Sequence, residues 1–299
     1  MKVASVEWPE NEWKRIDKPK TLIHKIKEYL EKATKEQVDI IVFPGFTGCF
    51  FQQLSCPQNR SVRSLLNNSD PGEYIQPVKV LSQNYPMAIC PGSYWKKEND
   101  NIYHESCLII NGEVQLTQRQ IYLARWEREL GFSRGIKIEL EEIKDWKLAL
   151  IISTDVFYPQ VSRMAALKGA DIVLSPVGFT GKKNWVLQIS GMWQEVQQNQ
   201  FFAVESGFNG FLGEQNFWGE SVIYAPLEMT KKEDGYLERS RGQKKLVVAQ
   251  LDNEQRRKAI SKFDVLSQLN REFYQQMKMF KHFKEDEYLE PRSLDRKMV

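Results

Sequence analysis

The sequence predicts an α/β fold in which two sheets pack face to face and helices cover their outer faces. The first indication is a strand–helix–strand pattern at 146–176, which is typical of parallel sheets covered by helices. The second is an earlier round of the same kind, a helical pattern at 18–36 followed by the apolar run 39–43. Between the two rounds, Asn111-Gly112 separates two strand-like runs, which is the strongest short signal for a hairpin.

The first round begins at the N-terminus. Residues 2–7 are predicted to form a strand, and residues 18–36 a helix whose apolar positions share one face. These positions are Leu22, Ile23, Ile26, Tyr29, Leu30 and Ala33. Residues 39–43 then predict a buried strand that Pro44-Gly45 closes.

The following stretch is less regular up to the hairpin. Residues 50–69 predict a helical turn or two among loops. A helix is expected at 73–84, with Pro77 near its first turn or at a kink. The other expected elements are a strand at 87–90, hairpin strands at 103–110 and 113–122, a charged loop at 124–135 and an edge strand at 136–143.

The second round is the stretch around which the chain is organised. An apolar strand ends at Ile152, a helix starts near Pro159, Gly169 ends that helix, and a short buried strand follows at 171–175. In open α/β sheets, ligands meet the carboxyl ends of the strands. Ser153 stands at such an end and is therefore where a nucleophile is expected.

The sequence after residue 176 continues the alternation of helices and strands. The expected elements are a helix at 183–199, strands at 201–204 and 220–224, a polar loop at 231–243, a strand at 245–251 and a long helix at 254–283. A charged tail follows from residue 284.

Composition narrows the classes of function. The 299 residues carry a net charge of only +3, which gives no electrostatic ground for nucleic acid or an acidic membrane surface. No secretory signal and no apolar run of about 18 residues is found. The four cysteines have no metal-binding or redox spacing, so we expect a cytoplasmic protein without metal or cofactor.

Several segments, in the right order, resemble the nitrilase or carbon–nitrogen hydrolase superfamily. They are KVASVEWPENEW at the start, DIIVFPGFTG at 39–48, NGEVQLTQRQIYL at 111–123, ELGFSRG at 129–135, LALIISTDVFYPQVSRMAALKGADIVLSP at 148–176 and FWGESVIYAP at 217–226. The resemblance implies an α-β-β-α sandwich, usually dimeric or larger, that hydrolyses or condenses nonpeptide C–N bonds. It places the domain at 1–275 and a C-terminal extension at 276–299.

All three catalytic positions depart from the family's pattern. The resemblance implies a glutamate base where this chain has Gly45, a charge-stabilising lysine at Gln120 and a cysteine nucleophile at Ser153. A glycine accepts no proton, a neutral amide stabilises an oxyanion poorly, and a serine hydroxyl needs a well-placed base. Three such losses predict a catalytically inactive protein.

Other residues remain as alternatives to the lost triad. A rearranged hydrolase would use Ser153 or Cys49 as nucleophile; its candidate bases are Glu127, Glu129 and Glu205. Glu205 is expected to follow a strand, and a buried, inert Cys49 is the simpler interpretation. His104 is expected to be a satisfied strand residue rather than a partner of Ser153.

The surroundings of the triad are also assigned by the resemblance. Phe46, Thr154, Gly178 and Phe179 are expected to line a neutral pocket. Arg119 and Asp155 stand beside the emptied positions, and we expect them to form ion pairs or hydrogen bonds to backbone.

Three hypotheses follow. The first is an inactive homodimer or larger homo-oligomer that binds a small ligand or a protein partner and associates through 159–168, 183–199 and the tail after 276. The second is an active amidase with a rearranged site, and the third is a purely structural subunit of a hetero-oligomer.

Overall fold

The computed structural model describes residues 1–58, 61–67, 70–242 and 245–276. Residues Met1–Phe263 form one compact unit, and the second unit starts at Asp264. Its described part contains helix α11 (Arg271–Gln276). The predicted domain boundary at residue 275 stays a prediction, and the predicted extension after 276 lies outside the described residues.

The first sheet contains the N-terminal strand. Its strand order is β16-β1-β2-β3-β5-β4, and β6 pairs with β5. β1, β2 and β3 are parallel, whereas the other pairs are antiparallel. The strands are β1 (Lys2–Val6), β2 (Ile40–Val42), β3 (Ala88–Cys90), β4 (Ser93–Glu98), β5 (Asn101–Ile110), β6 (Glu113–Arg119) and β16 (Leu246–Gln250).

The second sheet is built on the strand–helix–strand unit. Its order is β15-β14-β11-β9-β8-β7, with β8, β9 and β11 parallel. The strands are β7 (Leu140–Ile143), β8 (Trp146–Leu150), β9 (Ile172–Val177), β11 (Phe202–Gly207), β14 (Val222–Tyr224) and β15 (Tyr236–Arg239). A small third sheet has the order β10-β13-β12, formed by β10 (Phe179–Thr180), β12 (Gly210–Leu212) and β13 (Gln215–Trp218).

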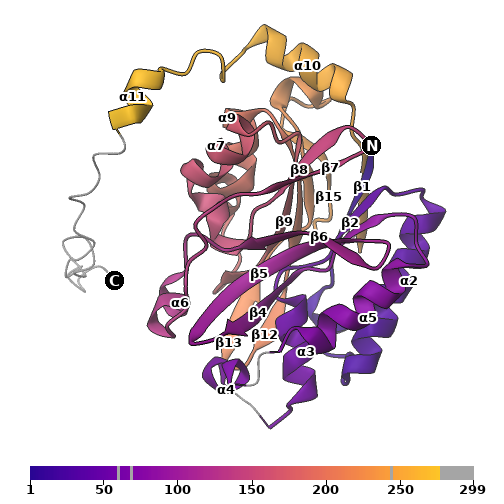
Figure 1. Ribbon diagram of the computed structural model, residues 1–299. Helices are drawn as coiled ribbons and strands as arrows, with labels where there is room; N and C mark the ends of the chain where they lie inside the picture. The colour runs from indigo at the N-terminus through magenta and orange to yellow at the C-terminus, as the bar shows by residue number, and fades with distance from the viewer. Residues whose placement is uncertain (59–60, 68–69, 243–244, 277–299) are drawn as a thin grey trace, which may run out of the picture. The chain divides into compact units, whose positions relative to one another are not determined.

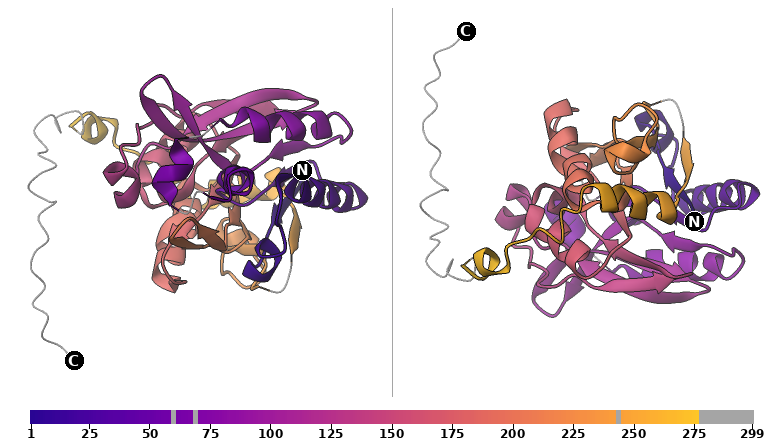
Figure 2. Two further views of the ribbon diagram at one scale, coloured as in Figure 1. Left: turned by 90° about the horizontal axis from the view of Figure 1, so that it is seen from below. Right: turned by 90° about the horizontal axis from the view of Figure 1, so that it is seen from above.

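The two large sheets pack face to face, because both contribute to one apolar core. That core includes Val42, Cys90 and Leu108 of the first sheet and Leu150, Leu174 and Val204 of the second. Helices α2 (Pro19–Lys35), α3 (Thr47–Ser55) and α5 (Gly72–Ser82) cover the first sheet, and α7 (Pro159–Leu167) and α9 (Gln194–Asn199) cover the second (Figures 1 and 2). The predicted α-β-β-α sandwich is confirmed.

Short helices connect these layers. They are α1 (Glu10–Trp13), α4 (Val62–Leu66), α6 (Arg125–Glu129), α8 (Trp185–Gln188) and α10 (Asn253–Lys262), the 3₁₀ turns η1 (Ser153–Phe157) and η3 (Leu227–Met229), and the π-turn η2 (Ile189–Trp193). No helix of the described ranges is long and apolar enough to cross a membrane.

Several local predictions were wrong. The charged loop expected at 124–135 contains α6, and the polar loop at 231–243 contains β15, which pairs with β14. The long helix expected at 254–283 ends at Lys262, and residues 277–283 lie outside the described chain. Of the two alternatives for Pro77, a position in the first turn is wrong, because Pro77 lies in the second turn of α5.

The helix expected at 183–199 is present but interrupted. Gly191 has φ −94° and ψ −132°, which are not helical, so α8, η2 and α9 form three pieces. Glycine has no Cβ to oppose such a departure. The break leaves several apolar side chains of α8 and η2 exposed.

Candidate functional site

The three degenerate positions meet at the end of strand β9. Ser153 donates a hydrogen bond from Oγ to the carbonyl oxygen of Gly178, 3.1 Å away. Gly45 packs against the backbone of Val177, the residue before Gly178. Gln120 reaches the residue after Ser153, with Nε2 2.7 Å from Thr154 Oγ1. The sequence therefore identified positions that the fold brings together.

Ser153 is the first residue of η1, the 3₁₀ turn that follows β8, and its backbone is strained. Its φ is +48°, a region in which residues other than glycine are uncommon. The side chain is buried, and among the described residues no carboxylate or imidazole forms a hydrogen bond with its hydroxyl. A serine hydroxyl without a base is a weak nucleophile.

Gly45 has no room for a side chain. A Cβ atom added there would lie 2.5 Å from the carbonyl carbon and oxygen of Val177 and 2.8 Å from its nitrogen. Real Cβ atoms are essentially never this close to backbone. A glutamate at this position would therefore require β9 to move.

Gln120 is held by hydrogen bonds on both ends of its amide. Nε2 has two N–H donors and three acceptors within hydrogen-bond distance, which are Glu127 Oε2 at 2.8 Å, Thr154 Oγ1 at 2.7 Å and the carbonyl oxygen of Tyr122 at 3.0 Å. Oε1 accepts from His104 Nδ1. These bonds leave the amide no free donor for a substrate oxyanion.

His104 lies at the centre of this buried network. Its Nδ1 is 3.0 Å from Glu127 Oε1, and its Nε2 is 2.7 Å from Ser93 Oγ. Ser93 Oγ in turn accepts a hydrogen bond from the backbone N–H of Phe46 at 2.8 Å. The Ser93–His104–Glu127 sequence of contacts has the order of a serine-hydrolase triad.

This second serine is closed to substrate. Ser93 and the His104 side chain are fully buried, and the Phe46 ring stacks on the imidazole with centroids 4.6 Å apart. His104 is thus a satisfied strand residue, as the sequence predicted. The sequence did not predict that His104 contacts Gln120, or that Ser93 belongs to the same hydrogen-bond network.

Aromatic side chains pack beside Gly178, whose carbonyl oxygen accepts the Ser153 hydrogen bond. Phe46 is itself buried, and a Cβ added to Gly178 would lie 2.7 Å from its ring. The rings packed around Phe46 are those of Trp95, Trp126, Phe208 and Phe217. Phe179, which was expected in the pocket, is buried against Phe157 and Trp218.

Within the described residues, neither the fallback nucleophile nor the fallback bases form a hydrogen bond with the Ser153 hydroxyl. Cys49 is fully buried in α3, and burial holds the pKa of its thiol well above the ordinary value. Glu129 pairs with Arg125 on the surface, with Oε1 2.8 Å from Nε.

Glu205 lies inside β11 rather than after a strand. Its Oε1 accepts hydrogen bonds from Gln188 Nε2 at 2.7 Å and from Tyr224 Oη at 3.0 Å. Burial raises the pKa of this carboxyl to about 8. The neighbouring Val204 faces the core between the sheets, so Glu205 faces the helices that cover the second sheet.

Arg119 and Asp155 form the contacts expected of them. Arg119 pairs with Glu98 and, through Nε at 2.7 Å, with Glu105 Oε1. Asp155 accepts from the backbone N–H groups of Ile121 and Tyr122, the latter at 2.6 Å. Burial raises the pKa of the Asp155 carboxyl to about 8, although these backbone donors lower it.

A family model described as carbon-nitrogen hydrolase matches residues 2–259, most of the chain. The chain belongs to the carbon–nitrogen hydrolase family. The resemblance inferred from the sequence motifs is thereby confirmed.

Relatives with hydrolase names match at modest identity. The probable hydrolase YhcX of Bacillus subtilis is 26% identical over 234 residues, which are 75% of this chain and 45% of that protein. The omega-amidase NIT3 of Saccharomyces cerevisiae is 24% identical over 267 residues, 81% of this chain and 88% of that protein. The chain spans about half the length of YhcX and of the probable nitrilase C965.09 of Schizosaccharomyces pombe.

Solved structures show the same fold. A double mutant of the amidase from Nesterenkonia sp. AN1, in complex with acrylamide, superimposes with a TM-score of 0.71 at 18% identity. The match covers 93% of this chain and 97% of the amidase. At this identity, the similarity is one of fold alone.

Proposed function

We propose that this family member has lost carbon–nitrogen hydrolysis and acts by binding, either of a small ligand or of a protein partner. Gly45 carries the proposal, because its position offers neither a proton acceptor nor the space for one. Two further contacts support it. The Ser153 hydroxyl donates to a backbone carbonyl, and the Gln120 amide is engaged by Glu127, Thr154 and Tyr122.

A hydrolase with a rearranged site has less support. Cys49 is buried with a raised pKa, which disfavours the thiolate that attacks a substrate. Glu205 binds Gln188 and Tyr224, and Glu129 pairs with Arg125. Glu127 is buried against His104 and Gln120, and within the described chain its carboxylate forms no hydrogen bond with the Ser153 hydroxyl or the Cys49 thiol.

Turnover measurements test the proposed inactivity. The protein and its Ser153→Ala and Cys49→Ala variants are incubated with a panel of amides, nitriles and carbamoyl compounds, and ammonia release is measured. We expect no turnover that depends on either residue. Turnover by the unmodified protein that one of these variants abolishes would overturn the proposal.

The proposed binding role includes self-association. Trp185, Val186, Leu187 and Ile189 on α8 and η2 are 37–70% exposed, and Met164 and Leu167 on α7 are about half exposed. These six residues, here called the α7–α8 apolar surface, belong to two of the three segments that the sequence predicted for self-association, 159–168 and 183–199; the third, the tail after 276, lies outside the described residues. Exposed apolar groups of this kind often mark protein interfaces.

We also propose a cytoplasmic location. Cys49, Cys56, Cys90 and Cys107 are all free thiols, which suits a reducing compartment.

Size measurements on the isolated protein, repeated with co-purified partners, separate a homo-oligomer from a subunit of a hetero-oligomer.

A further inference from the structure

A basic hollow lies between the small third sheet and the segment that leads into α8. It has a volume of about 400 Å³. Its wall includes three cationic side chains, Lys182, Lys183 and Arg241, and two aromatic ones, Phe217 and Trp218. The chain is close to neutral as a whole, so this local gathering of cations requires its own explanation.

Two of these cations have no acidic partner within residues 1–58, 61–67, 70–242 and 245–276. Neither the Lys182 ammonium nor the Arg241 guanidinium forms an ion pair with a described residue. Lys183 contacts Glu220 Oε2 at 3.2 Å. That carboxylate is already held by Arg239, whose Nε and a terminal nitrogen lie 2.9 and 2.7 Å from its two oxygens.

The acidic groups of the hollow do not cancel this charge. Glu220 is one carboxylate shared by two cations, so the group of Glu220, Arg239 and Lys183 retains a net charge of +1. Glu7 is buried, its Oε2 accepts from Ser221 N and Ser240 Oγ, and burial raises its pKa. An anion entering the hollow therefore meets a positive field.

The hollow is also lined by Trp218, whose ring has an indole N–H that is unpaired among the described residues. Trp218 is only 5% exposed, and its indole N–H has no acceptor within the described chain. A buried donor without an acceptor is unfavourable by about 1–3 kcal/mol. The part of the indole ring that lines the hollow is an apolar surface beside the cations.

We propose that this hollow binds a small organic anion, with a carboxylate or phosphate group held by Lys182, Lys183 and Arg241 and an apolar part against Trp218. The site is separate from the degenerate triad and names a ligand class for the binding role proposed above. A negative titration would leave the inactivity proposal intact, because that proposal is tested by turnover.

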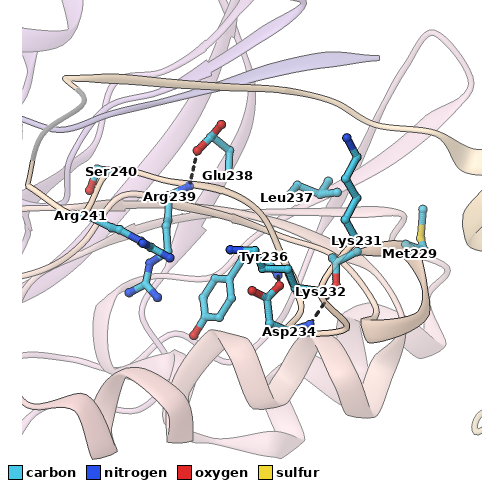
Figure 3. A pocket seen from close by; sticks show the side chains of 11 residues that line it. Met229, Lys231, Lys232, Asp234, Tyr236, Leu237, Glu238, Arg239, Ser240 and Arg241 are labelled. Atoms are coloured by element: carbon cyan, nitrogen blue, oxygen red, sulfur yellow. Dashed lines mark hydrogen bonds between the residues drawn. The ribbon is translucent and has the colours of Figure 1, made fainter.

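A neighbouring hollow supplies the control. It has a volume of about 540 Å³ and is lined by residues 229–232, 234 and 236–241, so that it shares Arg241. Figure 3 shows Arg239 and Arg241 at one end of it and Lys231 at the other. Replacing Lys231 and Lys232 with glutamine removes two positive charges away from the proposed site.

The test follows indole N–H signals of ¹⁵N-tryptophan-labelled protein by NMR, with Trp218 assigned through Trp218→Phe. The probes are phenyl phosphate, benzoate, inorganic phosphate and neutral benzyl alcohol. We expect a saturable shift of the Trp218 signal with phenyl phosphate or benzoate. In Lys182→Gln/Arg241→Gln the Kd should rise by at least about tenfold, and in Lys231→Gln/Lys232→Gln by less than about twofold.

Three results would overturn the proposal. The first is the absence of a saturable shift with phenyl phosphate and benzoate up to about 10 mM, which corresponds to negligible affinity. The second is equal weakening in the two double variants, which would mean a general effect of net charge. The third is equal binding of benzyl alcohol or of inorganic phosphate, which would exclude an organic anion as the ligand. All four substituted side chains are on the surface, and the unperturbed tryptophan signals report whether each variant is folded.

Discussion

Gly45 differs from the other two degenerate positions, because it could not regain a side chain in the present backbone. Gln120 and Ser153 carry side chains with defined hydrogen-bond partners, whereas Gly45 is in contact with the Val177 backbone. Backbone atoms within a central strand cannot give way as a flexible side chain can. The three substitutions thus have different structural consequences.

Adding one methyl group at Gly45 tests this contact. We expect Gly45→Ala to lower the free energy of unfolding by about 1–3 kcal/mol, as overpacking of a core does. The measurement is urea unfolding followed by circular dichroism. Gly210→Ala is the matched control, since a Cβ there would lie 3.5 Å or more from its neighbours. Equal stabilities of the two variants would contradict the steric account.

Asp155 ties the residues after β6 to the turn after Ser153. Replacing it with alanine leaves the N–H groups of Ile121 and Tyr122 without their acceptor, and we expect a loss of about 2–4 kcal/mol. Asp155→Asn keeps one oxygen acceptor and should lose less. Thermal unfolding of the two variants provides the measurement, and an unchanged melting temperature in Asp155→Ala would show that the carboxyl has no structural role.

Glu205 should make stability depend on pH. Its pKa is raised from 4.5 to about 8 in the folded protein, so between these values the folded state binds more protons than the unfolded state. The stabilisation that the Glu205 carboxyl contributes is therefore complete below pH 4.5 and is lost as the pH rises through 8. Between these values, the free energy of unfolding decreases by up to about 1.4 kcal/mol per pH unit.

Glu205→Gln removes the titrating group while keeping an oxygen for Tyr224 and Gln188. We expect the free energy of unfolding of this variant, relative to the unmodified protein, to increase between pH 5 and 8 in urea titrations. Glu254→Gln is the control, because that carboxylate is 78% exposed on α10. Parallel pH profiles for Glu205→Gln and the unmodified protein would show that Glu205 is not protonated in the folded state.

At the scale of elements, the hairpin shows what the sequence could and could not predict. Asn111-Gly112 correctly predicted β5 and β6, but a two-residue turn continued regularly would place Gln120 opposite Tyr103. An irregularity between Leu108 and Ile109 shifts the register by one residue. Gln120 N therefore bonds to His104 O, and the network of Gln120 with His104 could not be predicted from the turn.

Other elements also divide into those that the local sequence could predict and those that depend on contacts distant in sequence. The strands β1, β2, β8 and β9 were predictable, because each is an apolar run bounded by turn or helix signals. Helix α6 was not, since it is one short turn of charged residues whose buried member, Glu127, is stabilised by contacts with Gln120 and His104. Strand β15 exists through its pairing with β14, a long-range contact that local composition does not report.

At the scale of the whole molecule, the α7–α8 apolar surface predicts self-association. We expect a mass above the 35.0 kDa of one chain in size-exclusion chromatography with light scattering at micromolar concentration. Val186→Lys should shift the protein to monomer, because a charge buried in an interface is strongly unfavourable.

The control for this variant is Ile136→Lys, which alters an equally apolar side chain that is 93% exposed outside the two helices. It should leave the mass unchanged. A monomeric unmodified protein, or the same dissociation by Ile136→Lys, would refute the assigned interface.

The contact between Gly45 and Val177 also limits what protein engineering can do at this position. A glutamate introduced at residue 45 by a single substitution would meet the main chain of β9, because even its Cβ would lie 2.5 Å from Val177. An engineer who wants a base there must therefore redesign the course of this strand together with residue 45.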